Sequence, residues 1–211
     1  MSSKSRVVLV APSYDYLTGH LARWLTEIGE KYITIYDCTL LVGDDANRHT
    51  LTNLIDQRDD ALILVFFGHG ARNGFLCEPG RGETIESDHD LLCSGDDFVR
   101  LETIEILAYC CYASLQFGEQ VRSRGLNTFL GYKGEIWFYF TREEAFKRVV
   151  CIAVEQALAA REISPRSLEV LRLAYRAEHT KWFAGEYSHE PDAMFVCMCL
   201  QRHLKLLDTE V

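Results

Sequence analysis

Two stretches of apolar residues, each ending at a chemically reactive side chain, constrain the fold of this chain most strongly. Residues 61–67 are all apolar and are followed directly by Gly68-His69-Gly70. Residues 104–109 are mostly apolar and end at Cys110-Cys111. Such runs are typical of strands that are buried on both faces of a sheet. They predict a histidine and a cysteine at the carboxyl ends of two strands, which is the edge where open α/β sheets form their sites.

Strand-like and helix-like patterns alternate along the rest of the chain, which predicts crossover units and a mostly parallel sheet covered by helices on both faces. We therefore predict an α/β fold in which residues 1–211 form one domain, with the helices from about residue 141 packing on the sheet. The remaining strands are expected at 7–11, 33–36 and 127–132. Residues 72–101 indicate a hairpin or excursion that ends in a short helix at 96–101. Helices are expected from Thr18, after a turn at 44–47, over 115–124, from a capping box at Thr141, from Ser164-Pro165 and over 193–200.

Charge and composition exclude several classes of function. The net charge of −9 and the pI near 5.3 argue against binding to nucleic acid or to an anionic membrane, because both require clustered Lys and Arg. The N-terminal residues contain no apolar core long enough for a signal peptide, and no segment has the length of a transmembrane helix. We therefore expect a cytoplasmic protein. Its eight cysteines show no Cys-x-x-Cys spacing, so we expect mostly buried, reduced thiols, no metal site and no cofactor.

The histidine and the cysteine together carry a specific chemistry. A cysteine attacks as its thiolate, so a neighbouring base such as His69 must lower the thiol pKa or remove its proton. Rigid strand ends would keep the two side chains in a fixed relation, and the glycines beside His69 would let a substrate carbonyl approach the backbone. The N–H groups of Gly70 and of the cysteine itself would then form an oxyanion hole.

Gly68-His69-Gly70 after one hydrophobic strand, and a cysteine with small neighbours after a second, resemble the shared motif of the caspase-like cysteine peptidases. This group includes caspases, metacaspases, legumain, gingipain, separase and CHAT domains. The chain looks most like the stand-alone bacterial CHAT and gingipain-like members, and the resemblance covers about residues 7–137. It implies a caspase-haemoglobinase fold, with His69 as general base and Cys111 as nucleophile. It also implies a thioester acyl-enzyme, a dyad that needs no metal, and limited cleavage of a protein substrate.

The cysteine motif departs from the family pattern, which is a small residue, Cys, any residue, Ser or Thr, and Gly. With Cys111 as the nucleophile, the small Cys110 precedes it, and Ala113 and Ser114 stand where the family has Ser or Thr and Gly. With Cys110 as the nucleophile, the bulky Tyr109 precedes it. We therefore prefer Cys111. Adjacent residues of a strand face opposite sides, so the other cysteine is expected to be buried packing.

The resemblance places the specificity pocket in the loop after the first strand and in the segment after the strand that follows the cysteine. Asp15 and Glu135 lie there and would accept a Lys or Arg side chain of the substrate, although each also fits a surface or turn position. The acidic stretch 83–97 is interpreted either as a solvated loop or as a wall that attracts a basic substrate. An acid-selecting pocket of the caspase type would instead need an arginine, for which Arg72 is best placed. Trp137 resembles a tryptophan of CHAT domains and is expected to pack in the core.

Bacterial members of this group often activate a cell-death or defence effector by cleavage. The resemblance therefore suggests antiviral defence, with a gasdermin-like effector as the protein substrate. Two other interpretations stay open. One is a catalytically silent caspase-like domain that serves as a protein-interaction module, which the unusual cysteine motif favours. The other is a flavodoxin-like binding domain, but Pro12-Ser13-Tyr14 stands where such a domain would have a Gly-rich phosphate loop.

Overall fold

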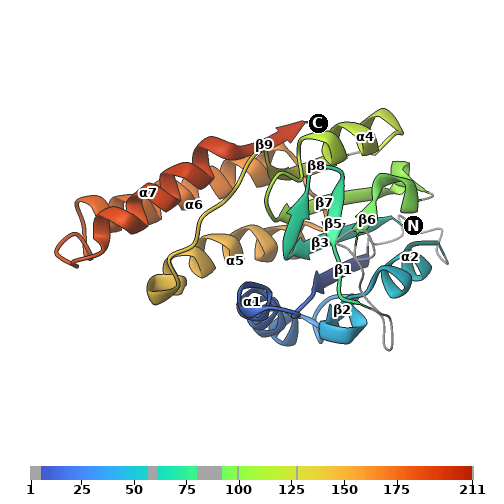
Figure 1. Cartoon of the computed structure of the whole chain (residues 1–211), viewed down its shortest axis with the longest axis horizontal. Helices are drawn as coiled ribbons and strands as arrows, with labels where there is room; N and C mark the ends of the chain where they lie inside the picture. The colour runs from blue at the N-terminus through green and yellow to red at the C-terminus, as the bar shows by residue number, and fades with distance from the viewer. Residues whose placement is uncertain (1–5, 57–60, 80–91, 99, 127, 211) are drawn as a thin grey trace.

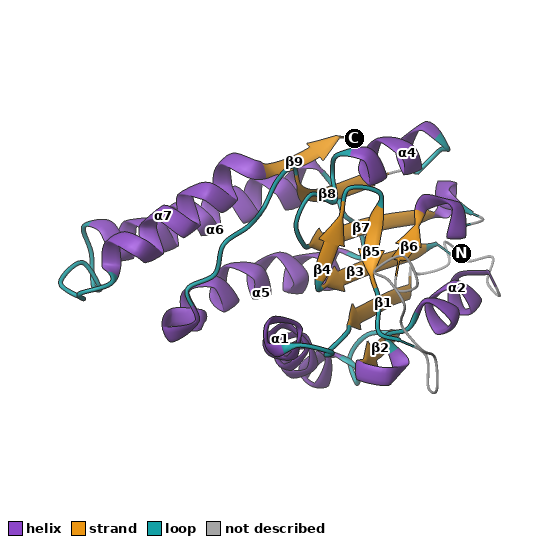
Figure 2. Ribbon diagram, in the orientation of Figure 1, coloured by secondary structure: helices purple, strands orange, loops and turns teal. Residues whose placement is uncertain are grey.

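A six-stranded sheet lies at the centre of the computed structural model, which describes residues 6–56, 61–79, 92–98, 100–126 and 128–210. The strand order is β2-β1-β3-β7-β8-β9; the first five strands run parallel, and β9 is antiparallel to β8. Figures 1 and 2 show this sheet between two layers of other elements, which confirms the predicted α/β fold. The strands are β1 (Arg6–Ala11), β2 (Cys38–Val42), β3 (Leu62–Phe67), β7 (Ile104–Tyr109), β8 (Thr128–Tyr132) and β9 (Leu207–Glu210).

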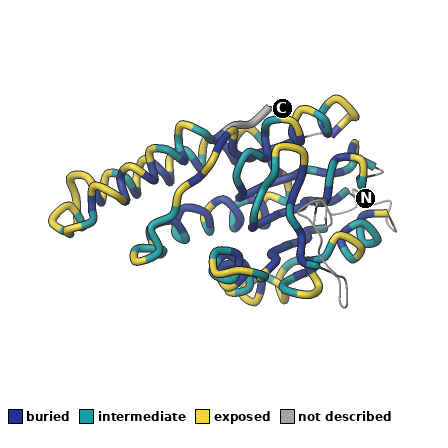
Figure 3. The backbone as a smooth tube through the Cα atoms, viewed as in Figure 1, coloured by how far each residue is buried: buried dark blue, intermediate teal, exposed yellow. Residues whose placement is uncertain are grey.

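Both faces of the sheet are buried, because successive side chains of its strands point to opposite sides. Val7 and Leu9 of β1 pack into one apolar cluster, whereas Val8 and Val10 pack into the other. Figure 3 shows the central strands in the colour of buried residues. One face carries the four-helix layer, which consists of α1 (Tyr16–Tyr32), α5 (Glu143–Ala160), α6 (Pro165–Phe183) and α7 (Ala193–Leu206). The other carries the mixed layer, which consists of α2 (Arg48–Asp56), α4 (Gln116–Ser123) and a small antiparallel sheet of β4 (His69–Ala71), β5 (Gly74–Leu76) and β6 (Leu92–Ser94).

The second strand begins later in the chain than the sequence pattern predicted. We expected it at 33–36, whereas β2 begins at Cys38. The reason is that α1 continues to Tyr32, and the N–H groups of Ile35 and Tyr36 both bond to the carbonyl of Tyr32. Ile35 is 63 % exposed, so this stretch is the frayed end of a helix.

The starts of two helices also differ from the prediction. α1 begins two residues before Thr18, because Asp15 is its N-cap and forms a capping box with Thr18. Thr141 does not cap α5, since it lies in a 3-10 turn that leads into the helix at Glu143. The start predicted at Ser164 is confirmed, with a capping box that Ser164 and Ser167 form.

The segment between β3 and β7 contains the small antiparallel sheet and two single turns. We expected a short helix at 96–101, and 3-10 turns instead occupy Gly95–Asp97 and Leu101–Thr103. Further 3-10 turns lie at Gly43–Asp45 and Phe140–Arg142. Within the described ranges, no helix has both the length and the apolar character that crossing a bilayer requires.

Candidate active site

Strands β3 and β7 are neighbours, and they bring the histidine and cysteine motifs to the same edge of the sheet. Their register pairs Phe67 with Tyr109, so His69 and Cys111 each follow the last paired residue by two positions. Beyond the strands the motifs approach each other through the backbone. A Cβ atom on Gly70 would lie 2.1 Å from the carbonyl oxygen of Cys111. Only glycine fits at this contact, which fixes the distance between the two motifs.

An acid at the start of α1 orients His69. The Nε2 atom of His69 lies 2.6 Å from Oδ2 of Asp15, and the N–H of Thr18 donates to Oδ1 of the same carboxylate at 2.8 Å. Burial alone would raise the pKa of Asp15, but hydrogen bonds from Thr18 and His69 outweigh burial and hold the pKa below its usual value. Asp15 is therefore ionised at neutral pH, and it can hold His69 by a charge-assisted hydrogen bond.

The loop that carries Asp15 is itself anchored to the segment after the small sheet. The N–H of Ser13 donates to a carboxylate oxygen of Glu78 at 2.5 Å, and the N–H of Glu78 donates to the carbonyl of Ala46 at 3.0 Å. Glu78 is buried. These contacts hold the loop after β1 in place, so the Asp15 carboxylate stands at a defined position beside His69.

The two adjacent cysteines face opposite sides of the sheet. Cys110 is completely buried and packs in the mixed layer, whereas Cys111 is partly exposed and packs against the four-helix layer. Burial raises the pKa of Cys110 well above its usual value, which keeps it a protonated packing residue. Of the two, Cys111 is the thiol that an external molecule can reach.

The sulfur of Cys111 contacts the backbone of the segment that follows β8. The N–H of Ile136 donates to Sγ at 3.4 Å, and Sγ lies 3.9 Å from the carbonyl oxygen of Ile136. Burial raises the pKa of Cys111; the Ile136 N–H and the charge of Arg202 act against it, while the carboxylate of Glu135 adds to it. The pKa lies above the usual value for a thiol, so Cys111 is protonated at neutral pH and its attack requires a base.

A strained turn follows Cys111 directly. Tyr112 has φ of 57°, in the left-handed region that residues with a side chain rarely adopt. Such a conformation costs about 1 kcal/mol or more. The N–H of Tyr112 donates to the carbonyl of Gly134 at 3.2 Å, which ties the turn to the same segment that contacts the sulfur.

The other residues predicted to shape the site are Glu135 and Trp137, in the segment after β8, and Arg72, directly after β4. Glu135 is exposed, and its carboxylate lies 4.0 Å from the guanidinium of Arg202. Trp137 was expected in the core, but it is 44 % exposed and the Arg202 guanidinium lies 4.1 Å from its ring centre. The prediction was wrong because Ile136 takes the buried position of this segment. Arg72 has an exposed side chain and is not a buried arginine of an acid-selecting pocket.

The acidic stretch 83–97 falls largely outside the described residues, which resume at 92. Its last two acids form ion pairs within the fold: Asp96 lies 3.2 Å from Arg124, and Asp97 lies 2.5 Å from Arg48. No cluster of three or more His, Cys, Asp or Glu side chains suited to a metal ion occurs within the part of the chain that the structure describes.

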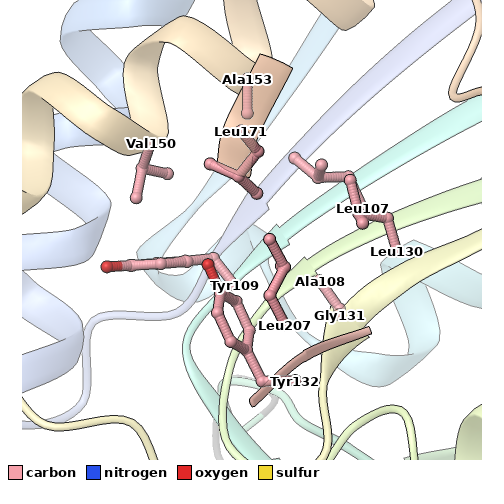
Figure 4. A pocket seen from close by; sticks show the side chains of 10 residues that line it. All are labelled: Leu107, Ala108, Tyr109, Leu130, Gly131, Tyr132, Val150, Ala153, Leu171 and Leu207. Atoms are coloured by element: carbon pink, nitrogen blue, oxygen red, sulfur yellow. The ribbon is translucent and has the colours of Figure 1, made fainter. Parts of the chain in front are cut away.

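A small internal cavity lies between the sheet and helices α5 and α6. Its volume is about 10 Å³, and Figure 4 shows the side chains that line it, with Tyr109 and Tyr132 among them. This volume holds about one water molecule, so the cavity is a packing gap and cannot accept a peptide.

Two contacts of the site were not anticipated from the sequence. The hydrogen bond between Asp15 and His69 joins residues 54 positions apart. The spacing of Asp15 and Thr18 is a recognisable N-cap signal, so the position of Asp15 at the edge could have been inferred. Arg202 and His203 lie beyond the end of the predicted helix at 200 and carry no motif that would mark them.

Known proteins resemble this chain in fold and not in sequence. No protein-family model and no curated protein matches the sequence. The solved complex of the pro- and mature domains of RgpB from Porphyromonas gingivalis superimposes with a TM-score of 0.54 at 10 % identity, over 98 % of this chain and 46 % of that one. The chain has a caspase-like fold. A crystal structure of the Arg-specific cysteine proteinase gingipain R (RgpB) aligns over 98 % of this chain and 45 % of that one, with a TM-score of 0.49 and 8 % identity. The chain thus spans less than half the length of either solved chain.

Proposed function

We propose that this chain is a cysteine endopeptidase in which Cys111 is the nucleophile, His69 the general base and Asp15 the residue that positions His69. The observation that carries the proposal is the shared sheet edge. His69 and Cys111 follow two strands that pair in register, and Gly70 packs against the backbone of Cys111. The partial exposure of Cys111, beside the complete burial of Cys110, supports Cys111 as the nucleophile.

The reaction needs no group beyond these residues and water. His69 takes the proton of the Cys111 thiol, and the thiolate adds to the scissile carbonyl carbon. When the tetrahedral intermediate collapses, His69 returns the proton to the leaving amine and a thioester remains on Cys111. Water then attacks the thioester while His69 accepts one of its protons. The acid product leaves and the thiol is restored.

Backbone donors would stabilise the negative oxygen of the intermediate. We assign this role to the N–H groups of Gly70 and Cys111, which belong to the two motifs that meet at the edge. Gly70 suits the role because the missing side chain lets a substrate carbonyl approach its backbone.

An electrophilic peptide probe tests the proposal directly. A peptide acyloxymethyl ketone should modify the intact protein once, and mass spectrometry of the digest should place the adduct on Cys111. Prior treatment of the protein with a small thiol reagent that modifies Cys111 should block the reaction. Failure of the probe to react with folded protein would refute the peptidase proposal.

The raised pKa of Cys111 favours a second candidate function, a catalytically silent interaction module. Its sulfur contacts the backbone of Ile136, and the ring of His69 contacts Asp15. In such a module the two residues would serve packing and surface roles. Binding of a protein partner that survives unchanged when Cys111 is replaced, together with absent probe labelling, would support this alternative.

Asp15→Asn separates the positioning of His69 from the capping of α1. Asparagine is a good N-cap, so the helix should keep its stability. Loss of the carboxylate charge should lower kcat by about a hundredfold or more, because an amide cannot hold the His69 ring in place by a charge-assisted hydrogen bond. Steady-state kinetics and thermal unfolding of the same preparations measure the two effects.

Thr18→Ala is the matched control for Asp15→Asn. It removes the hydroxyl that accepts from the N–H of Asp15 and donates to Oδ1, but it keeps the backbone N–H that caps through Oδ1 and leaves Oδ2, which faces His69, untouched. We expect it to lower stability by about 1 kcal/mol and to retain most of the activity. An Asp15→Asn variant with full kcat would show that Asp15 only caps the helix.

For the substrate, we propose a basic side chain before the scissile bond, accepted by Glu135. The Asp15 carboxylate is engaged with His69 and Thr18, whereas the Glu135 carboxylate is exposed near Cys111 and lies 4.0 Å from the Arg202 guanidinium, a loose pairing with which a substrate cation can compete. Glu135→Gln should reduce kcat/KM for Lys and Arg peptides about tenfold relative to apolar peptides, and this ratio separates the pocket from the effect of Glu135 on the thiol. A peptide library measures this preference.

Glu102→Gln is the control for Glu135→Gln, because Glu102 is an exposed acid that precedes β7, at the end of the strand opposite the site. It removes the same charge and should leave the peptide preference unchanged. A preference for Asp or for an apolar residue in the unmodified protein would contradict a basic pocket.

The natural target that we propose is a cytoplasmic protein cut at one or a few sites, with a gasdermin-like defence effector as the specific case. The resemblance described above supports this choice. Incubation of the purified chain with such an effector should create one new N-terminus, and His69→Ala should fail to produce it. Extensive degradation of the effector would argue for a general protease instead.

A further inference from the structure

Helix α7 donates hydrogen bonds to the backbone of residues 135–137, the segment that contacts the candidate nucleophile Cys111. The Nε of Arg202 donates to the carbonyl of Glu135 at 2.6 Å, and Nε2 of His203 donates to the carbonyl of Trp137 at 2.7 Å. These two carbonyls flank Ile136, whose N–H donates to the sulfur of Cys111. Two neighbouring residues of α7 therefore set the position of the one backbone amide in contact with the thiol.

The Arg202 side chain is held in place from two directions. Its guanidinium lies 4.1 Å from the centre of the Trp137 ring, in a cation–π contact, while its Nε is bonded to Glu135. A planar guanidinium keeps such a stacked orientation better than a lysine ammonium would. The charge of Arg202 is thereby fixed beside the segment 135–137.

The His203 side chain supplies a neutral and rigid anchor. It is completely buried, and burial lowers its pKa to about 4. Its Nδ1 lies 3.1 Å from the hydroxyl of Tyr175, which lies 2.7 Å from the hydroxyl of Tyr132. At neutral pH His203 therefore holds the backbone without contributing a charge, and Arg202 is the cation of the pair.

The groups around Cys111 divide into those that oppose its thiolate and those that favour it. Burial and the carboxylate of Glu135 oppose the thiolate, and the N–H of Ile136 and the charge of Arg202 favour it. Cys110 and Tyr109 on the same strand end also interact with Cys111, and both are buried and protonated; His69 follows the end of the adjacent strand. Both favourable influences thus depend on Arg202, because it also holds the backbone next to Ile136.

We propose that Arg202 is a positioning residue for Cys111, which aims the Ile136 amide at the sulfur and supplies the fixed positive charge that favours the thiolate. Its effect on turnover rests on the proposed peptidase function, but its effect on the thiol does not. Helix α7 therefore adjusts the reactivity of Cys111, which lies 91 positions before Arg202 in the chain (202 − 111).

Alkylation of the intact protein by iodoacetamide tests the proposal without requiring turnover. Mass spectrometry follows the peptide that contains Cys111, with the partly exposed Cys151 on α5 as an internal reference. Arg202→Gln should slow alkylation of Cys111 at pH 7 roughly threefold to tenfold, because a smaller fraction of Cys111 is then thiolate. The midpoint of the rate–pH profile should move to higher pH. The alkylation rate of Arg202→Lys should lie between those of Arg202→Gln and the unmodified protein, since lysine keeps the charge but lacks the planar guanidinium.

Two further variants keep the result interpretable if Arg202→Gln folds poorly. Trp137→Leu removes the ring on which the guanidinium stacks and should shift the profile in the same direction by less. Lys205→Gln removes an exposed charge one turn further along α7 and should leave the profile unchanged. A folded Arg202→Gln or Trp137→Leu protein with the original profile, or an equal shift in Lys205→Gln, would overturn the proposal.

Turnover separates this proposal from the peptidase proposal. If both hold, Arg202→Gln lowers kcat for apolar peptides and leaves their KM nearly unchanged, because these peptides do not use Glu135, the carboxylate that pairs with Arg202. A shifted alkylation profile in a protein that cleaves no peptide would refute the peptidase function and support the role of Arg202. Peptide cleavage by Arg202→Gln with an unshifted alkylation profile would support the peptidase function and refute the role of Arg202.

Discussion

Cys111→Ala is expected to abolish peptide cleavage and probe labelling, whereas Cys110→Ala is expected to retain both. The first change removes the partly exposed thiol at the sheet edge, without which no acyl-enzyme forms. The second replaces a completely buried thiol by a slightly smaller methyl group and should cost about 1 kcal/mol of stability. Cleavage of a fluorogenic peptide measures the activity, and thermal unfolding measures the stability.

The two cysteine variants act as controls for each other, because the residues are adjacent and chemically identical. Equal unfolding temperatures of Cys111→Ala and unmodified protein would exclude misfolding as the cause of lost activity. Activity that persists in Cys111→Ala but disappears in Cys110→Ala would move the nucleophile by one residue. It would also require the two side chains to exchange the faces that the structure gives them.

Gly70→Ala is expected to abolish activity and to destabilise the fold. The added methyl would lie 2.1 Å from the carbonyl oxygen of Cys111 and 2.9 Å from the sulfur of Cys110. The first contact involves backbone, which cannot turn aside as a flexible side chain would, so the two motifs must move apart. We expect a loss of roughly 1–3 kcal/mol from overpacking and a larger relative loss of activity. Chemical denaturation and peptide cleavage measure the two losses.

Gly19→Ala is the matched control for Gly70→Ala, since a methyl at this position of α1 would meet no atom within 4 Å. It should be neutral or stabilising by up to about 1 kcal/mol, as expected for a glycine in a helix. The double variant Gly70→Ala/Cys110→Ala relieves only the contact with sulfur and should not recover activity. An active and stable Gly70→Ala protein would show that the two motifs do not meet as described.

The central strands could be predicted from the sequence because burial on both faces leaves an uninterrupted apolar run. β3 and β7 have this character, and the candidate residues His69 and Cys111 follow their ends. The edge of the sheet is less visible in the sequence. β2 is only half-buried, and β9 has the mixed sequence Leu-Asp-Thr-Glu and pairs antiparallel with β8, so neither has a distinctive pattern.

The candidate site was predictable only as far as its motifs extend. His69 and Cys111 follow apolar strands, so their place at the carboxyl edge could be inferred from local sequence. The partner of His69 depends on β1 lying next to β3, a long-range adjacency that residue types alone do not specify. Arg202 is 67 positions from Glu135, and only the packing of α7 brings the two together.

The separation of the two apolar clusters by the sheet has a consequence for how this protein can change. The clusters share no residue, and the sulfurs of Cys110 and Cys111 belong to different ones. Substitutions in α2 or α4 can reach the Cys111 sulfur only through the backbone of β7 or of β4, whereas those in α7 act on it through the segment that touches it. In a random-mutagenesis screen for altered thiol reactivity, the positions of the variants should therefore be unevenly distributed over the fold. Variants that change the reactivity of the thiol should gather in α7, in residues 134–138 and in the His69-Gly70 motif of β4, whereas variants of α2 and α4 should lose reactivity only together with folding.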